Sequence, residues 1–166
     1  LYIRWFQYGT FTPMQRSHGS GVKKEIYNLG KKGDWVYDTE EKYINLRYAL
    51  LPYLYSTGWQ VTNNAGSFFR ALFMDFNEDK NVHNISNQYM FGRSFLVTPV
   101  TQNMYVFSDK KKWESPYEDF SKTGFQEVYL PKGTKWIDFW TGQTFEGGQT
   151  IKKDVPIDII PLYVRA

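Results

Sequence analysis

The stretch QEVYLPKGTKWIDFWTGQTF, residues 126–145, decides the fold. It contains three short runs rich in aromatic and β-branched residues, a composition that favours strands. The three runs are residues 126–130, 136–140 and 144–145. Residues 131–133 (Pro-Lys-Gly) and 141–143 (Thr-Gly-Gln) separate the runs with turn-forming residues. This part of the chain therefore predicts short strands joined by tight turns.

The same pattern continues on both sides of this stretch. Further runs of strand-forming residues occupy 68–76, 94–100 and 159–164, and Gly147-Gly148 adds another turn. Several short strands within about 100 residues predict a small antiparallel β-sandwich. Residues 105–124 interrupt the pattern with charge, Ser and Pro116, and we expect a long surface loop there.

Before Gly66 the spacing of apolar residues becomes helical. Apolar side chains recur every three or four residues over 39–61, a pattern typical of an amphipathic helix. Asp38 and Glu41 have the spacing of an N-terminal capping pair, Pro52 predicts a bend, and Asn63, Asn64 and Gly66 predict the end. The apolar face is wide, so we expect this helix to be covered on two sides.

Composition excludes several classes of protein. The chain has 166 residues, with 20 Lys and Arg against 17 Asp and Glu, and a net charge of +3 is too weak for a nucleic-acid binder. The one dense basic cluster, residues 110–112, is interpreted as a solvated loop. The absence of cysteine excludes disulfides, thiolate zinc sites and a Cys nucleophile. The longest apolar stretch, 48–55, is too short for a membrane span.

Common catalytic signatures are missing from the sequence. It has no glycine-rich phosphate loop, no His-x-x-x-His pair and no Gly-x-Ser-x-Gly elbow. His18 and His83 are far apart, so a shared metal site is not expected, and no cofactor is predicted. The carboxylates at 75–79 fit an ordinary turn, and Asp138 is expected to face water or cap a neighbouring turn.

Blocks of residues along most of the chain match one enzyme family in order and spacing. RWFQYGTFTP (4–13) and RSHG (16–19) resemble the end of the catalytic barrel of glycoside hydrolase family 31. YINLRY (43–48) and LLPYLY (50–55) resemble its last barrel helix. FRAL (69–72) resembles the crossing to the next domain, with Ala71 in place of the usual Pro. The blocks that resemble its proximal C-terminal β-sandwich are QYMFG (88–92), LVTPV (96–100), VYLP (128–131), WIDFWTG (136–142) and PLYVRA (161–166).

The resemblance implies retaining hydrolysis of α-glucosides or α-xylosides, with one Asp as nucleophile and a second as acid and base. In the family both aspartates lie on barrel strands upstream of the matched blocks. His18 matches the histidine that hydrogen-bonds sugar hydroxyls, at the end of a last barrel strand and loop expected over 10–18. Arg16 is a weaker candidate, which could orient this loop. Phe11 and Trp5 are weaker candidates for stacking on the sugar ring.

We therefore expect a mainly β fold, with residues 1–66 as a remnant (last strand, loop and helix) of a (β/α)8 barrel and 67–166 as the sandwich. The parent enzyme would act on an α-linked oligosaccharide or glycoside, and the chain alone would be inactive. The helix over 39–61, without neighbouring barrel elements, would self-associate or pack on the sandwich. The alternative is a non-catalytic β-sandwich that binds carbohydrate through Trp136 or Trp140, or one with a purely structural role.

Overall fold

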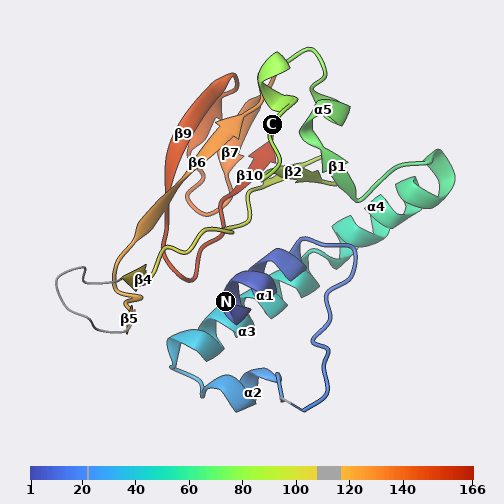
Figure 1. Cartoon of the computed structure of the whole chain (residues 1–166). Coiled ribbons are helices and arrows are strands. Elements are labelled where there is room, and N and C mark those ends of the chain that lie inside the picture. The colour runs from blue at the N-terminus through green and yellow to red at the C-terminus, as the bar shows by residue number, and fades with distance from the viewer. Residues whose placement is uncertain (22, 108–116) are drawn as a thin grey trace.

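The computed structural model describes residues 1–21, 23–107 and 117–166, with helices first and strands after them (Figure 1). The helices are α1 (Tyr2–Thr10), α2 (Ile26–Leu29), α3 (Trp35–Ala49), α4 (Leu51–Asn64), the short α5 (Leu72–Asp75) and the 3-10 turn η1 (Lys80–Val82). The strands are β1 (Phe69–Ala71), β2 (Tyr89–Phe91), β3 (Phe95–Val97), β4 (Val106–Phe107), β5 (Tyr117–Glu118), β6 (Gly124–Leu130), β7 (Lys135–Asp138), β8 (Thr144–Glu146), β9 (Gln149–Val155) and β10 (Leu162–Arg165).

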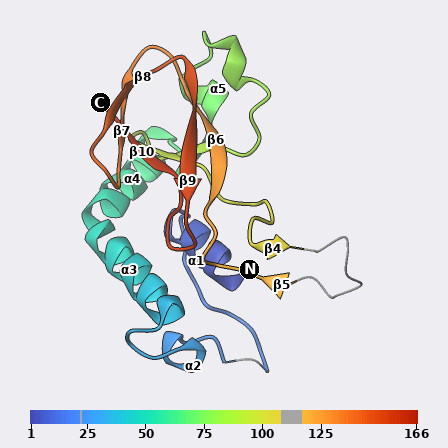
Figure 2. The same cartoon turned by 90° about the vertical axis from the view of Figure 1, so that its left-hand side faces the viewer.

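Six strands form one antiparallel sheet in the order β1-β2-β3-β10-β7-β8. The last strand, β10, lies inside this sheet, with Tyr163 opposite Leu96 of β3 on one side and Asp138 of β7 on the other. Strands β6 and β9 pair with each other over seven residues and form a separate ribbon (Figure 2). The predicted antiparallel sandwich is confirmed.

The six-stranded sheet is covered on both faces, because neighbouring side chains of a strand point in opposite directions. In β10, Tyr163 belongs to a core shared with the ribbon and α5, whereas Leu162 belongs to a core shared with α1, α3 and α4. The ribbon-side core contains Leu72, Phe76, Val82, Met90, Leu96, Val128, Leu130, Trp136 and Tyr163. The helix-side core contains Phe11, Tyr43, Leu50, Phe91, Phe95, Val97, Ile160 and Leu162. The helices are thus a third layer of the structure.

The helix predicted over 39–61 is two helices. Leu50 separates α3 from α4, and Pro52 lies in the first turn of α4, where its missing N–H leaves no helical bond unmade. The helical region starts earlier than predicted, at Trp35, because a turn closed by Asp34 N–H on Lys31 O (2.8 Å) precedes it. Asp38 is therefore not the cap but a first-turn residue that accepts from Gly33 N. The predicted end is confirmed, with left-handed Ala65 following Asn64.

Packing of the helices also differs from expectation. The wide apolar face is covered by the sheet through Tyr43 and Leu50, but Tyr48, Tyr55 and Trp59 are 69%, 84% and 54% exposed. Tyr53 ties α4 to the β2–β3 turn, donating to Phe91 O (2.8 Å). Among the described residues, α3 packs against α1 and α2 as well as against the strands, whereas α4 has no fully buried side chain and leaves much of its surface exposed.

Residues 10–18 were expected to form a strand and its loop, and the strand part of this expectation is wrong. Helix α1 continues through Thr10, and residues 14–19 have irregular backbone. A strand needs a neighbour for its backbone hydrogen bonds, and no described strand pairs with this segment. The run 68–76 is shorter as a strand than expected, since β1 ends at Ala71 and α5 follows. The cluster 110–112 and Pro116 lie outside the described residues. In the described ranges, no helix is long and apolar enough to cross a bilayer.

We expect the Trp136→Ala substitution to lower the free energy of unfolding by about 3–5 kcal/mol, since it opens a cavity in the core. Trp136 is fully buried, lies 5.8 Å from the Phe76 ring, and donates through Nε1 to Pro131 O (2.9 Å). Trp59→Ala, at a side chain 54% exposed, is the matched control, with an expected loss of at most about 1 kcal/mol. Urea unfolding of both variants measures the difference, and equal losses would contradict the assigned core.

Candidate functional site

The segment that follows α1 carries the predicted site residues Arg16 and His18. Both side chains are exposed, and neither makes a hydrogen bond or ion pair within the described ranges. The ring of His18 and the guanidinium of Arg16 are therefore accessible to a ligand. The structure does not join Arg16 to a carboxylate.

Arg47 of α3 holds the start of this segment. Its guanidinium donates to three backbone carbonyls, those of Thr10 (2.8 Å), Thr12 (2.6 Å) and Pro13 (3.0 Å). Burial lowers the pKa of Arg47. Three bonds from one planar group set the direction in which the chain leaves α1.

Closer to His18, the chain is held by Lys24, six residues further on, and by Tyr2 of α1. Lys24 Nζ donates to the carbonyl of His18 (2.7 Å), and the Tyr2 hydroxyl lies 3.2 Å from Ser17 Oγ. Gly19 has a positive φ of 149°, and a Cβ at this position would stand 2.7 Å from Lys24 Nζ. The main chain at His18 is thus anchored while its imidazole stays exposed, which suits a residue that contacts a ligand.

The aromatic candidates differ in accessibility. Phe11 is fully buried and meets Phe91 edge-on (6.2 Å, 83°), so its ring has no face open to a sugar in this structure. Trp5 lies on α1 and is 62% exposed. Trp136, expected at the surface in the carbohydrate-binding alternative, is fully buried, because its position in β7 faces the ribbon. Trp140 is half-buried and donates through Nε1 to Ile160 O (2.7 Å).

The carboxylates noted in the sequence have structural partners. Asp75 pairs with Arg70 (2.8 Å), and Asp79 accepts from Tyr129 Oη (2.7 Å). Asp138 caps the turn after β7 by accepting from Trp140 N (2.9 Å), as predicted, and it also pairs with Lys153 rather than facing water. Within the described ranges, no cluster of three or more His, Asp or Glu side chains could hold a metal ion.

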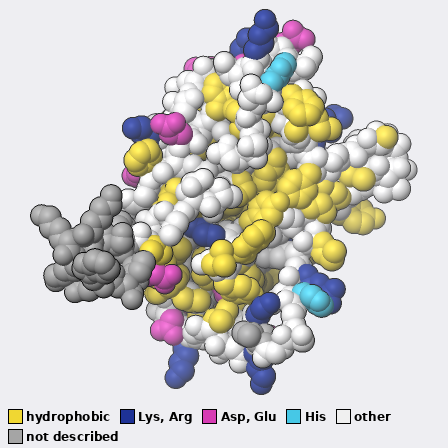
Figure 3. All heavy atoms as spheres, viewed as in Figure 1, with side chains coloured by type: hydrophobic (Ala, Val, Ile, Leu, Met, Phe, Trp, Pro, Cys, Tyr) yellow, Lys and Arg dark blue, Asp and Glu magenta, His cyan; other side chains and the backbone are white. Residues whose placement is uncertain are grey.

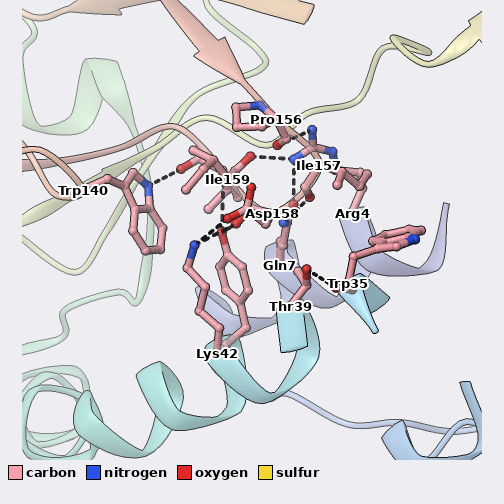
Figure 4. A network of polar contacts seen from close by, with 12 residues as sticks. Arg4, Gln7, Trp35, Thr39, Lys42, Trp140, Pro156, Ile157, Asp158 and Ile159 are labelled. Atoms are coloured by element: carbon pink, nitrogen blue, oxygen red, sulfur yellow. Dashed lines mark hydrogen bonds and ion pairs between the residues drawn. The ribbon is translucent and has the colours of Figure 1, made fainter. Parts of the chain in front are cut away.

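A second polar centre surrounds residues 155–160, the connection from β9 to β10, which we call the strap (Figure 4). Each of its six backbone carbonyls accepts at least one hydrogen bond from a side chain. The pairs are Val155 with Arg4 (3.0 Å) and Tyr105, Pro156 with Arg4 (3.1 Å), Ile157 with Gln7 (2.8 Å), Asp158 with Lys42 and Tyr43 (3.1 Å each), Ile159 with Arg4 (2.5 Å) and Ile160 with Trp140 (2.7 Å).

Most of these donors come from the helices. Arg4 and Gln7 belong to α1, and Lys42 and Tyr43 to α3. Burial lowers the pKa of Arg4 and raises that of Tyr43. The sequence contains no signal for this arrangement, since the carbonyls that bind the donors belong to the backbone and not to a motif. The strap joins the helical layer to the strands.

Comparison with known proteins matches the helical part and the strand part of the chain to two domain models of one family. A model of the glycosyl hydrolase family 31 C-terminal domain matches residues 65–166, and one of the family's TIM-barrel domain matches residues 1–57. The chain belongs to glycosyl hydrolase family 31. The strap contacts of α1 and α3 thus link residues matched by the barrel model to residues matched by the C-terminal domain model of this family.

Several members of the family are similar to the whole chain. It is 39% identical to an α-xylosidase of Saccharolobus solfataricus, over 100% of this chain and 20% of the relative. It is 29% identical to α-glucosidase 2 of Bacillus thermoamyloliquefaciens, over 99% of this chain and 18% of the relative. The crystal structure of a family 31 α-xylosidase from Xanthomonas citri matches with a TM-score of 0.83 and 39% identity, over 99% of this chain and 16% of that one. The chain spans about a fifth of the length of these curated relatives.

Glu40 of α3 is a buried carboxyl that the sequence does not single out. Its side chain is fully buried, and neither oxygen has a hydrogen-bond partner among the described residues. Burial raises the pKa of Glu40 to about 7, because the charged form loses its hydration. No local signal marks this site, since the neighbouring Glu41 is of the same residue type and only partly buried.

We expect the stability of this family 31 chain to fall as the pH rises from about 4.5 to about 7. In that window the folded state binds the Glu40 proton more tightly than the unfolded state, so raising the pH costs up to about 3 kcal/mol. Glu40→Gln should remove this part of the pH dependence, and Glu41→Gln should retain it. Urea unfolding at a series of pH values gives the comparison, and identical profiles for the two variants would contradict the assignment.

Arg4→Met should lower the free energy of unfolding by about 3 kcal/mol or more, since it leaves several strap carbonyls without donors. Arg16→Met is the matched control at an exposed arginine without contacts among the described residues, and should change stability by at most about 0.5 kcal/mol. Both are measured by chemical denaturation. Similar losses in the two variants would argue against the strap as the main link between the layers.

Proposed function

We propose that this chain forms the end of the catalytic barrel and the following sandwich of a retaining α-glycosidase, with residues 1–66 and 67–166 as the two parts. Membership of family 31 over both parts is the observation that carries the proposal. An α-xyloside is favoured over an α-glucoside as substrate, since two of the matched α-xylosidases are 39% identical to this chain and α-glucosidase 2 is 29% identical. The proposed reaction is hydrolysis of the α-glycosidic bond.

In this proposal His18 binds hydroxyl groups of the sugar. An imidazole can donate through one ring nitrogen and accept through the other, so it can pair with a hydroxyl in either direction. Hydrogen bonds to sugar hydroxyls strengthen in the transition state of glycoside hydrolysis and contribute to catalysis. The anchored backbone of residues 10–18 supports this role, because a held main chain limits the positions that the ring can take.

The chain alone is proposed to be inactive. Retaining hydrolysis requires two carboxyl groups about 5 Å apart, one as nucleophile and one as acid and base. Asp75, Asp79 and Asp138 are all engaged in ion pairs or backbone capping, and Glu40 is fully enclosed. These four carboxyl groups are therefore unsuited to either role, and in this proposal the catalytic pair is the one that the family carries on barrel strands upstream of the matched blocks.

A related proposal concerns association of the chain with itself. Tyr48, Tyr55 and Trp59 expose aromatic rings along α3 and α4, and burial of such surface favours self-association. Sedimentation of the wild type and of a Tyr55→Ser, Trp59→Ser variant tests it. A wild-type chain that remains monomeric at all concentrations would contradict it.

Titration of the protein with xylose, followed by NMR of the histidine rings, tests the sugar-binding role of His18. We expect the ring signals of His18 to shift and those of His83, an exposed histidine on the turn after η1, to stay unchanged. His18→Ala should abolish the saturable part of the response in the signals of the neighbouring residues 10–17. Equal shifts of both rings would contradict a specific role, and turnover of an α-xyloside by the pure chain would contradict its inactivity.

A further inference from the structure

A cavity of about 460 Å³ opens at the seam between α1 and the sheet. Its walls come from three segments distant in sequence, namely α1, the residues before β2 and those after β3. The residues that carry the argument are Trp5, Tyr8, Ser86, Asn87, Tyr89 and Thr101. Figure 3 shows hydrophobic side chains gathered across this face of the molecule. The volume lies within the range of about 300–1,000 Å³ typical of small-ligand sites.

One wall of the cavity is aromatic and held in place. Trp5 is 62% exposed and meets Tyr8 edge-on (5.9 Å, 70°), and Tyr8 in turn meets Tyr89 edge-on (6.1 Å, 86°). The Tyr89 hydroxyl donates to Phe11 O (2.8 Å), which fixes the base of this stack. An exposed indole supported at its edge offers a flat surface to a ligand.

The other wall carries uncharged polar side chains beside Pro99 and Val100. Ser86, Asn87 and Thr101 are exposed, and their side chains, like Trp5 Nε1, have no hydrogen-bond partner in the described part of the chain. The cavity lining includes no carboxylate, and the Nη donors of its one charged side chain, Arg4, bind the strap and Tyr105. Free hydroxyl, amide and indole groups around a flat ring suit a neutral ligand rich in hydroxyls.

We propose that this cavity binds one or two pyranose units of a neutral α-linked oligosaccharide, at a site distinct from His18. The C–H face of a sugar ring stacks on Trp5, and its hydroxyls pair with Asn87 and with Ser86 or Thr101. The choice of an α-linked sugar rests on the proposed function, whereas the cavity and its chemistry do not. An α-linked oligosaccharide would thus be held at a second point on the same protein.

Maltose is the probe, because it presents two α-linked glucose rings, and NMR of the folded chain reports on each wall separately. The indole N–H of Trp5 and the side-chain amide of Asn87 should shift with a common saturable curve. Trp5→Ala and Asn87→Ala should each weaken maltose binding about tenfold or more. Trp59→Ala, a matched exposed tryptophan on α4, and His18→Ala should leave the affinity unchanged.

Three results would overturn the proposal. In the first, maltose up to about 100 mM shifts neither Trp5 nor Asn87. In the second, binding is lost in His18→Ala but not in Trp5→Ala or Asn87→Ala, which supports the proposed function and removes this site. In the third, the Trp5 signals respond to protein concentration and not to maltose, which assigns the cavity to a second copy of the chain. Asn87→Ala, a change at an exposed loop side chain, keeps the test valid if Trp5→Ala unfolds.

Discussion

The hydrogen bonding of the strap is the constraint on which the arrangement of helices and strands depends. Six consecutive backbone carbonyls, from Val155 at the end of β9 to Ile160, lie at a junction between two layers, and each accepts a side-chain hydrogen bond there. Arg4, Gln7, Lys42 and Tyr43 supply most of these bonds from α1 and α3. The donors bind backbone carbonyl oxygens of the strap and not its side chains. These bonds therefore position the strap against α1 and α3 and do not require particular side chains in the strap. This bonding also explains why the half-buried Arg4 needs no carboxylate partner among the described residues.

Two arginines that bind backbone carbonyls hold different parts of the helical layer. Arg4 fixes α1 to the strap, and Arg47 fixes the segment after α1 to α3. A guanidinium suits both positions, because its planar array of N–H groups can reach several carbonyls at once. The path from the sandwich to His18 is therefore continuous, through the strap, α1 and the held residues Thr10–Pro13. The sandwich of this family 31 chain supports the helices mechanically, in addition to any contact it makes with sugar.

Burial separates the aromatic residues of this chain into structural and functional candidates. Phe11 and Trp136 fill the two cores on opposite sides of the sheet, whereas Trp5 remains exposed at the edge of a cavity. Their residue types and local spacing do not distinguish them. The same holds for Glu40 and Glu41, adjacent residues of which one is enclosed without a partner and the other is partly exposed.

The sequence by itself determined the class of fold, the sandwich and the family. Alternating apolar residues and turns placed β6, β7 and β8, and the RSHG block pointed to His18, since these signals are local. Pro52 predicted a bend within one helix, whereas the structure has two helices separated at Leu50. Strand β9 was missed because polar residues occupy five of its seven positions, and the three-residue strand β2 was also missed. The strand expected over 10–18 did not form, because strand pairing needs a neighbour that no local pattern supplies. Only the tertiary structure decided which aromatic rings are buried, how the strap is held and where the cavity lies, since each depends on segments that lie far apart in the chain.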